Sequence, residues 1–413
     1  MTITVDGTAV VHSVAEAEHY IARVCFKTGP PARTGVELEW TVHHGDDPTR
    51  PLDTSVLRAA LGPHAPHSID PTSPMSPLPG GSPVTVEPGG QVEISTPPAA
   101  SLAQLYERVE GDIAALERLL TRQGLVLGPN GIDPHRPPAP VVQTPRYAAM
   151  THAFQPYRPY GDVMMRSTAG LQICVDAGTG SQVGERWRAV HTLGPALLAA
   201  FANSRRHADR DTGWASARMR AWLRLDPRRT APVYTPGEPP PVASFGDKSA
   251  ALAADAWVRY AMTAPLLCVR RDGDCWQAPP ETTFVDWING ALPTRPTHDD
   301  LSYHLTTLFP PVRPRGYLEV RYLDTQPAGE WIAPVTALTS LLNSSEIIAE
   351  AERRASPTID RWEVAARSGT ADPAIAAAAH GLLALALENL PADAPALAGD
   401  LIRRRLGEIR GTA

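Results

Sequence analysis

Hydrophobic and polar residues alternate strictly along residues 35–42, which predicts a strand with one buried face. Shorter alternating runs at 84–87 and 91–95 are joined by Pro88-Gly89-Gly90 and predict a hairpin. Two later strands are expected at 171–176 and 317–321. The first strand separates the two kinds of residue by face, with Val36, Leu38, Trp40 and Val42 opposite Glu37, Glu39 and Thr41.

Apolar residues recur at helical spacing from Leu102 to Leu120, after a capping-box sequence at Ser101 to Gln104 and before Gly124. Further helices are expected up to about residue 22, near 55–61, over 184–203 and 248–260, and through most of the chain after residue 333. Residues 44–82 are rich in Pro, Asp, Ser and Gly, which predicts a long loop around the short helix. The pattern indicates an α+β fold with an antiparallel sheet and helices on one side.

Composition narrows the class of protein. The chain has 413 residues, 43% of them hydrophobic, which is enough for one large domain or two smaller ones. Its 38 basic and 44 acidic residues give a net charge of −6, so no global attraction to nucleic acid is expected. The first residues lack a signal-peptide pattern, and the most apolar segment, 374–387, is too short for a membrane span. The four cysteines have no zinc-knuckle or redox spacing, so we expect a cytoplasmic protein with reduced thiols.

The candidate chemistry lies in carboxylates on the polar faces of separate strands, namely Glu37, Glu39, Glu87, Glu93 and Glu319. Residues i and i+2 of a strand share a face about 6.6–6.8 Å apart, so neighbouring strands can surround a cavity with such pairs. Mg²⁺ binds carboxylate oxygens and keeps water and phosphate oxygens as its other ligands. The alternation alone favours a solvated sheet face, because charged residues are mostly exposed, and leaves the metal site open.

Glu319 and Arg321 share a face of the late strand, either as a metal ligand beside an anion-binding guanidinium or as an ordinary charge pair. Residues 178–184 miss the dinucleotide fingerprint by one residue, and the chain has no P-loop, nucleophile elbow or HExxH sequence. Four histidines in or beside the Pro-rich loop lack a matched ligand set, and we expect a surface role for them: His43, His44, His64 and His67.

Several of these stretches together resemble the glutamate-cysteine ligases of the plant and proteobacterial type, and especially the actinobacterial members that serve ergothioneine biosynthesis. They occur in the family's order between residues 35 and 324. The stretches are Gly35-Val-Glu-Leu-Glu39, Glu87-Pro-Gly-Gly-Gln-Val-Glu-Ile-Ser95, Pro145-Arg-Tyr147, Met164-Met-Arg-Ser-Thr-Ala-Gly-Leu-Gln172, Phe201-Ala-Asn-Ser204 with Gly213, and His304-Leu-Thr-Thr-Leu-Phe-Pro310 with Tyr317-Leu-Glu-Val-Arg321. Departures are Arg205 in place of a proline, and Tyr322-Leu-Asp324 in place of Gly-Ala-Asp.

The resemblance implies a glutamine synthetase-like fold, with a curved antiparallel sheet and helices packed on its outer side. It implies one catalytic domain over 1–413, with sheet-forming motifs at 35–324 and a helical part at 334–413. It further implies an ATP- and Mg²⁺-dependent ligase that joins glutamate to cysteine through an acyl phosphate, acting as a monomer or homodimer. Another amine acceptor, or a non-catalytic member of the fold, stays open as an alternative.

The resemblance also assigns roles to individual residues, and it favours the metal site over a solvated face. The five glutamates would hold Mg²⁺ and the triphosphate. The catalytic candidates are Arg321 and Arg166, and the substrate-binding candidates are Thr168, Gln172, Arg146, Tyr303 and Trp287. None of the four cysteines takes part in this chemistry.

Overall fold

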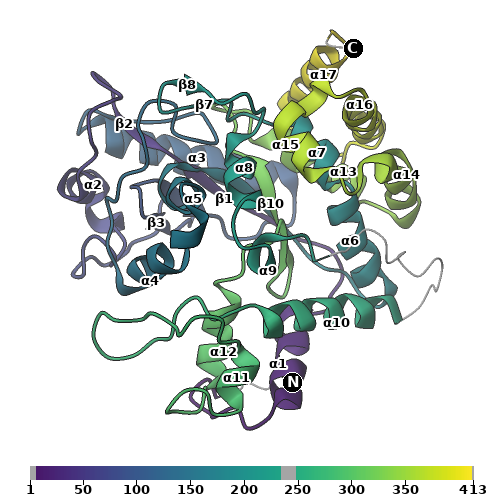
Figure 1. The fold of residues 1–413 in the computed structure, drawn as a ribbon. Coiled ribbons are helices and arrows are strands. Elements are labelled where there is room, and N and C mark those ends of the chain that lie inside the picture. Colours follow the sequence, from purple (N-terminus) through teal and green to yellow (C-terminus); the bar gives the residue numbers. More distant parts are fainter. Residues whose placement is uncertain (1–5, 234–247, 412–413) are drawn as a thin grey trace.

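The computed structural model describes residues 6–233 and 248–411. Six strands form one antiparallel sheet in the order β3-β4-β1-β6-β10-β9 (Figure 1). Two short ribbons, β2-β5 and β7-β8, lie outside it. The strands are β1 Thr34–Trp40, β2 Val42–His44, β3 Val84–Val86, β4 Val92–Ser95, β5 Leu125–Leu127, β6 Gly170–Val175, β7 Arg206–His207, β8 Arg210–Asp211, β9 Val312–Pro314 and β10 Leu318–Asp324.

Helices make up most of the remaining described chain. The α-helices are α1 Val14–Cys25, α2 Thr54–Leu61, α3 Leu102–Thr121, α4 Pro145–Ala153, α5 Tyr160–Ser167, α6 Ser181–Thr192, α7 Gly194–Ala200, α8 Ala217–Leu223, α9 Pro227–Thr230, α10 Lys248–Thr263, α11 Phe284–Ile288, α12 His298–Leu305, α13 Ile332–Leu341, α14 Ser345–Ala355, α15 Trp362–Ser368, α16 Pro373–Glu388 and α17 Ala396–Gly411. Short 3-10 turns occur at Gly62–His64, Gln155–Tyr157, Ser356–Thr358 and Gly369–Ala371.

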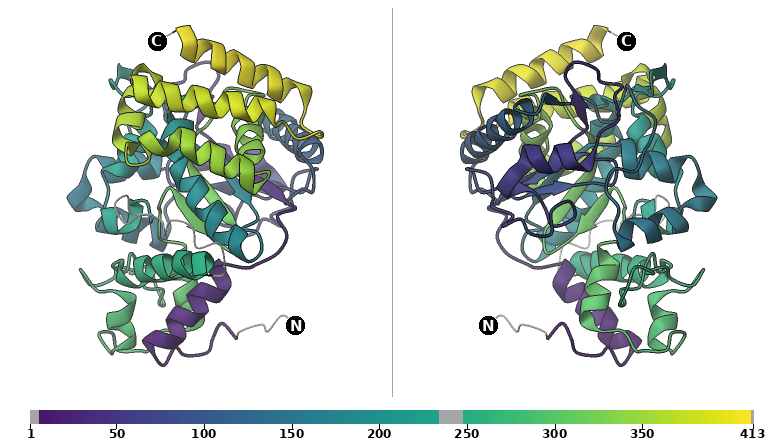
Figure 2. Two further views of the ribbon diagram at one scale, coloured as in Figure 1. Left: turned by 90° about the vertical axis from the view of Figure 1, so that its right-hand side faces the viewer. Right: turned by 90° about the vertical axis from the view of Figure 1, so that its left-hand side faces the viewer.

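The alternation of residues explains how the sheet separates a core from a site. The apolar residues of the central strands are buried against helices, and α3 packs on β1 while α7 packs on β10. The C-terminal helices α13 to α17 stack behind α7, and Figure 2 shows them together at one end of the molecule. Helix α1 lies beside α10 at the opposite end. The predicted α+β class, with an antiparallel sheet and helices on its outer side, is therefore confirmed.

Two predicted elements and the expected exposure of two histidines differ from what is observed. The first strand ends at Trp40, and the chain then joins β5 in a separate ribbon. His43 and His44 belong to that ribbon and are buried, so the expected surface role is wrong for them. The helix expected at 184–203 is divided at Leu193, before Pro195, because proline cannot donate the backbone hydrogen bond that a continuous helix needs there.

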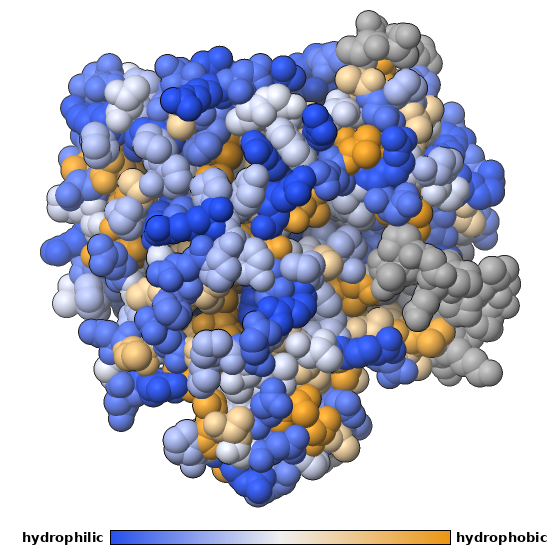
Figure 3. Space-filling model, viewed as in Figure 1, coloured by the Kyte–Doolittle hydropathy of each residue, from blue (hydrophilic) through white to orange (hydrophobic). Residues whose placement is uncertain are grey.

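Strand β10 contains a bulge between Val320 and Leu323, where two residues of β10 face one residue of β6. Bulges re-aim side chains and leave backbone groups outside the regular ladder. Among the described residues, no single helix is both long and apolar enough to cross a membrane, and two helix pairs that reach this only together are bent by 110° and 82°. The face drawn in Figure 3 is mostly hydrophilic, with its hydrophobic residues in small separate groups.

Candidate active site

A cavity of about 360 Å³ lies against the inner face of the sheet. The polar faces of β1, β4, β6 and β10 form one wall, and α4, α5 and α8 contribute the other. The residues that line it are Glu37, Glu39, Glu87, Pro88, Gln91, Glu93, Ser95, Arg146, Tyr147, Met150, Met164, Met165, Thr168, Gln172, Trp222, Thr306, Phe309, Arg313, Arg315 and Arg321. The cavity therefore brings together four of the five predicted metal ligands.

Strand register explains this convergence. Glu39 on β1 is the direct partner of Glu93 on β4, and Glu37 is the partner of Gln172 on β6. Directly opposed side chains in an antiparallel pair lie about 4.5–5.5 Å apart at their Cβ atoms. Like charges at that distance repel each other, so the sheet holds an arrangement that costs stability unless a cation compensates for it.

The turn between β3 and β4 is built for close approach to the end of α5. A Cβ on Gly89 would lie 2.1 Å from the carbonyl oxygen of Arg166, and Gly90 has a φ of +83°, so glycine is required at both positions. The side chain of Gln91 accepts a hydrogen bond from the Gly89 N–H and donates one to the carbonyl of Thr168. These contacts fix Glu87, which precedes the turn, at the cavity.

Glu319 differs from the other glutamates because three arginines surround it. Its carboxylate accepts from Arg313 at 2.7 Å, Arg321 at 2.8 Å and Arg315 at 3.2 Å, and it is fully buried. Burial opposes its ionisation, yet the nearby Arg313 and Arg321 hold the pKa of Glu319 below its ordinary value. Glu319 is therefore an ionised anchor for a cluster of guanidinium groups.

Gln172 connects this cluster to the glutamates. Its amide nitrogen donates to Glu39 at 3.0 Å, and its amide oxygen accepts from Arg321. Glu39 also accepts from the backbone N–H of Gly170 at 2.7 Å. A continuous set of hydrogen bonds thus runs from β1 through β6 to β10 across the floor of the cavity.

Three of the other carboxylates, Glu37, Glu87 and Glu93, have raised pKa values. Burial, and then the charge of Glu319, raises the pKa of Glu37 to about 7. Burial, and then the charge of Glu39, raises the pKa of Glu87 to about 7. Burial and the neighbouring glutamates raise the pKa of Glu93 well above its usual range, although Thr85 donates to it at 2.7 Å. These shifts are those of carboxylates that lack a positive partner.

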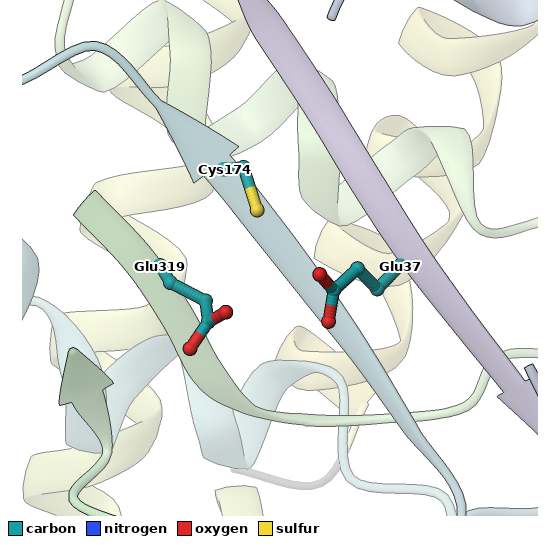
Figure 4. A group of neighbouring side chains, drawn as sticks. All are labelled: Glu37, Cys174 and Glu319. Atoms are coloured by element: carbon teal, nitrogen blue, oxygen red, sulfur yellow. The ribbon is translucent and has the colours of Figure 1, made fainter. Parts of the chain in front are cut away.

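The donor set fits a divalent cation with hard ligands. Within the described chain, Glu37, Glu39, Glu87 and Glu93 form no ion pair with a basic side chain, and all four offer oxygen atoms to one cavity. Oxygen ligands of this kind suit Mg²⁺, which also retains water and phosphate oxygens. The ligand atoms of Glu37, Glu319 and Cys174 lie within 4.8 Å of one another and point toward a common space (Figure 4).

The opposite wall combines one guanidinium with apolar side chains. Arg146 on α4 donates to the hydroxyl and the carbonyl of Thr306 at 3.0 and 3.2 Å. Beside it lie Met150 of α4, Met164 and Met165 of α5, Trp222 of α8, and Phe309. Thr168 also lines the cavity, and its hydroxyl donates to the carbonyl of Met164. This wall offers an anion contact beside a surface suited to a small apolar group.

Besides Glu319, three predicted site residues do not line the cavity. The guanidinium of Arg166 pairs with Asp162 and donates to Thr151, so it joins α5 to α4 and lies outside the cavity. Tyr303 lies behind the lining, with its ring centroid 5.1 Å from the guanidinium carbon of Arg146. Trp287 is buried in the main core and donates to the carbonyl of Thr294. The structure therefore places Arg166, Tyr303 and Trp287 outside the lining of this cavity, and their roles in catalysis and substrate binding stay predictions.

Arg313 and Arg315 were missed by sequence reasoning. They are two positions apart, directly before the turn that leads to Glu319, and Arg313 is the cross-strand partner of Glu319 in the sheet. That spacing is a signal for two cations on one face of a strand, but it becomes meaningful only when the partner strand is known.

Residues 33–407 match the sequence pattern of glutamate-cysteine ligase family 2 (GCS2). The chain belongs to this family. It is 37% identical over 395 residues to glutamate–cysteine ligase EgtA of Mycobacterium tuberculosis, covering 94% of this chain and 86% of the relative. It is 38% identical to EgtA of Mycolicibacterium smegmatis, covering 94% and 88%. These family members are therefore similar to it over almost their whole length.

More distant family members match a shorter part. The chloroplastic glutamate–cysteine ligase of Brassica juncea is 30% identical over 253 residues, which is 59% of this chain and 46% of the plant protein. The crystal structure of a glutamate–cysteine ligase from Francisella tularensis in complex with AMP has a TM-score of 0.50 at 12% identity, covering 93% of this chain and 83% of that one. At this identity the likeness concerns the fold, and it supports the predicted glutamine synthetase-like architecture.

Proposed function

We propose that this protein is an ATP- and Mg²⁺-dependent glutamate–cysteine ligase. The observation that carries the proposal is the convergence of Glu37, Glu39, Glu87 and Glu93, without basic partners, on a cavity that also holds Arg321. Membership of the glutamate-cysteine ligase family supports the choice of substrates. The names of the mycobacterial relatives support the same activity.

The reaction joins two steps. The γ-carboxylate of glutamate attacks the γ-phosphorus of ATP, which gives γ-glutamyl phosphate and ADP. The amine of cysteine then attacks the acyl carbon, phosphate leaves, and the amine loses a proton as the amide bond of γ-glutamylcysteine forms. Such an acyl phosphate needs protection from water, which a cavity with an apolar wall provides.

The residues of the cavity divide this work. The four unpaired glutamates, with Glu319 at their edge, would hold Mg²⁺, which when bound neutralises phosphate charge. Arg321, fixed by Glu319 and Gln172, donates hydrogen bonds where charge develops on the transferred phosphoryl group. Arg313 and Arg315 add positive charge on the same side. Gln172 and Thr168 orient substrate groups at the floor of the cavity.

Arg146 is the proposed contact for a substrate carboxylate on the opposite wall. Its guanidinium is held by Thr306 and by the ring of Tyr303, so it is oriented before substrate arrives. The methionines beside it offer a polarizable surface for a small thiol side chain. The whole chain acts as one catalytic domain in this proposal, and its product serves ergothioneine biosynthesis.

The decisive experiment is a product assay by mass spectrometry with ATP, Mg²⁺ and glutamate, and with cysteine or one of a panel of other amino acids. We expect γ-glutamylcysteine and ADP in equal amounts, dependent on all components. A product formed only with another amine would replace cysteine as the acceptor. No ATP-dependent product and no binding of ATP with Mg²⁺ in calorimetry would refute the proposal.

Substitution of the central ligands tests the role of the cavity. Glu39→Gln and Glu93→Gln each replace a candidate metal ligand with a side chain of the same shape, and the amide in Glu39→Gln keeps one of the two hydrogen bonds that Glu39 accepts. We expect the fold to be retained and turnover to be lost. Circular dichroism and ADP release are measured on the same samples. ADP release equal to that of the unchanged protein would contradict the assignment of these residues.

A further inference from the structure

Asp324 is a buried carboxylate at the end of β10 that does not line the cavity. It accepts three hydrogen bonds, from the backbone N–H of Asn203 at 2.8 Å, the hydroxyl of Ser204 at 2.7 Å and the hydroxyl of Ser216 at 2.8 Å. Burial raises the pKa of Asp324, although these donors and nearby Arg218 oppose the rise. A group that costs this much to bury needs an explanation in the fold or the chemistry.

The two serines connect Asp324 to α8. Ser216 is the N-cap of α8 and accepts from the N–H of Met219, while Ser204 accepts from the N–H of Arg218. The backbone donors at the start of this helix are thus satisfied by hydroxyl groups that Asp324 orients. Asp324 therefore joins the start of α8 to the end of β10 through these two hydroxyl groups.

Helix α8 in turn supports Arg321 of β10. The guanidinium of Arg218 donates to the carbonyl of Arg321 at 2.8 Å, within the bulge of β10. The guanidinium carbons of Arg218 and Arg321 lie 5.6 and 5.5 Å from the centroid of the Trp222 ring, so both cations contact this ring. Trp222 and Arg321 both line the cavity.

We propose that Asp324 is a positioning residue of the ligase reaction, which joins the N-terminus of α8 to the end of β10 and thereby sets Trp222 and Arg218 against Arg321. This inference rests on the proposed function. It also gives a role to Asn203 and Ser204, which stand in a family-like stretch of the sequence and do not line the cavity.

The test compares Asp324→Asn with Asp112→Asn in the full-length protein. Asp112 is a matched control, because it is equally buried and accepts from the N–H groups of Gly80 and Ser82, but it lies on α3, outside the cavity. We expect both variants to unfold at lower temperature. We expect only Asp324→Asn to lose about tenfold or more in kcat, with a smaller change in KM for ATP. The reason is that displacement of Arg321 reduces the stabilisation of the transition state more than it reduces the binding of ATP.

A spectroscopic readout separates this proposal from the proposed function. The protein is labelled with 5-fluorotryptophan, and the ¹⁹F resonance of Trp222 is assigned by its loss in Trp222→Phe. We expect this resonance to shift in Asp324→Asn and not in Asp112→Asn. If the unsubstituted protein forms no product, the proposed function fails, and the resonance still tests the coupling.

Ser204→Ala removes one of the three hydrogen bonds that Asp324 accepts. It replaces Asp324→Asn as the test variant if Asp324→Asn does not fold. We expect a smaller loss of kcat and a smaller shift of the Trp222 resonance. The proposal is overturned if the folded variant keeps kcat within about twofold of the unsubstituted protein and leaves the resonance in place. Equal losses of kcat in Asp324→Asn and Asp112→Asn overturn it as well.

Discussion

The half-buried glutamates of the cavity predict that the protein is less stable at high pH unless Mg²⁺ is present. Glu37 and Glu87 have pKa values of about 7 in the folded state against an ordinary value of 4.5. Between these two pH values the folded state keeps protons that the unfolded state releases. The free energy of unfolding therefore falls as pH rises from 4.5 to about 7, and the loss is complete above that.

The magnitude follows from the shift. A pKa raised from 4.5 to about 7 corresponds to about 3 kcal/mol of lost stability for each ionised carboxylate. More than half of this loss is already present at pH 6, and about 1 kcal/mol for each group is lost between pH 6 and pH 8. The free energy of unfolding of a protein is typically about 5–15 kcal/mol in total, so a change of this size is measurable.

Mg²⁺ should reverse the loss, because a cation that binds only the folded state adds RT ln(1 + [Mg²⁺]/Kd) to the free energy of unfolding. At a concentration about 100 times Kd, the gain is about 2.7 kcal/mol. The assay is urea denaturation at pH 6 and pH 8, with MgCl₂ or with EDTA. We expect the larger effect of Mg²⁺ at pH 8, where protons no longer compete for the carboxylates.

The control is the double variant Glu37→Gln, Glu87→Gln, whose amides do not titrate. Its unfolding free energy in EDTA should fall less between pH 6 and pH 8 than that of the unsubstituted protein, and Mg²⁺ should add less. The reasoning is refuted if both proteins show the same pH dependence in EDTA. It is also refuted if Mg²⁺ stabilises both equally.

Three further predictions concern single residues. Arg321→Lys should lower kcat by about 100-fold while KM for ATP changes less, because a lysine cannot reproduce the directed donors of a guanidinium, and steady-state kinetics measures both. Arg166→Gln should lower the unfolding free energy by about 1–3 kcal/mol, because the contacts of Arg166 with Asp162 and Thr151 are structural. Its kcat should stay within about threefold of that of the unsubstituted protein. Denaturation and turnover measured on one sample distinguish this structural role from a catalytic role. Cys174→Ser should keep turnover in the ligation assay, since no thiol takes part in the reaction, and loss of product with the fold intact would contradict this.

The faces of the strands could be predicted because alternation has a fixed period. Glu37 and Glu39 share a face in the sequence pattern, and they share it in the sheet. The family resemblance then indicated that Glu87 and Glu93 meet them. What the pattern did not contain is the register between strands, which pairs Glu39 with Glu93.

The placements that the sequence did not anticipate arise where tertiary contacts decide the position of a side chain. Arg166 stands in a family-like stretch. Its guanidinium pairs with Asp162, which lies one helical turn earlier on α5, and so it does not reach the cavity. Trp287 was chosen by proximity in the sequence, and its side chain belongs to the core. Arg313 was missed because its partner Glu319 lies across a turn, and no local pattern separates such a pair from a solvent-exposed cation.

The cavity presents opposite charges at two ends of one sheet face, with guanidinium groups around Glu319 on β10 and unpaired carboxylates on β1 and β4. We expect this distribution of charge to favour one orientation of a ligand that carries a cation at one end and an acidic leaving group at the other. Turned end for end, its cation would meet arginines and its anion would meet glutamates. The order of charges along the sheet face would thus select the orientation of the ligand before the reaction begins.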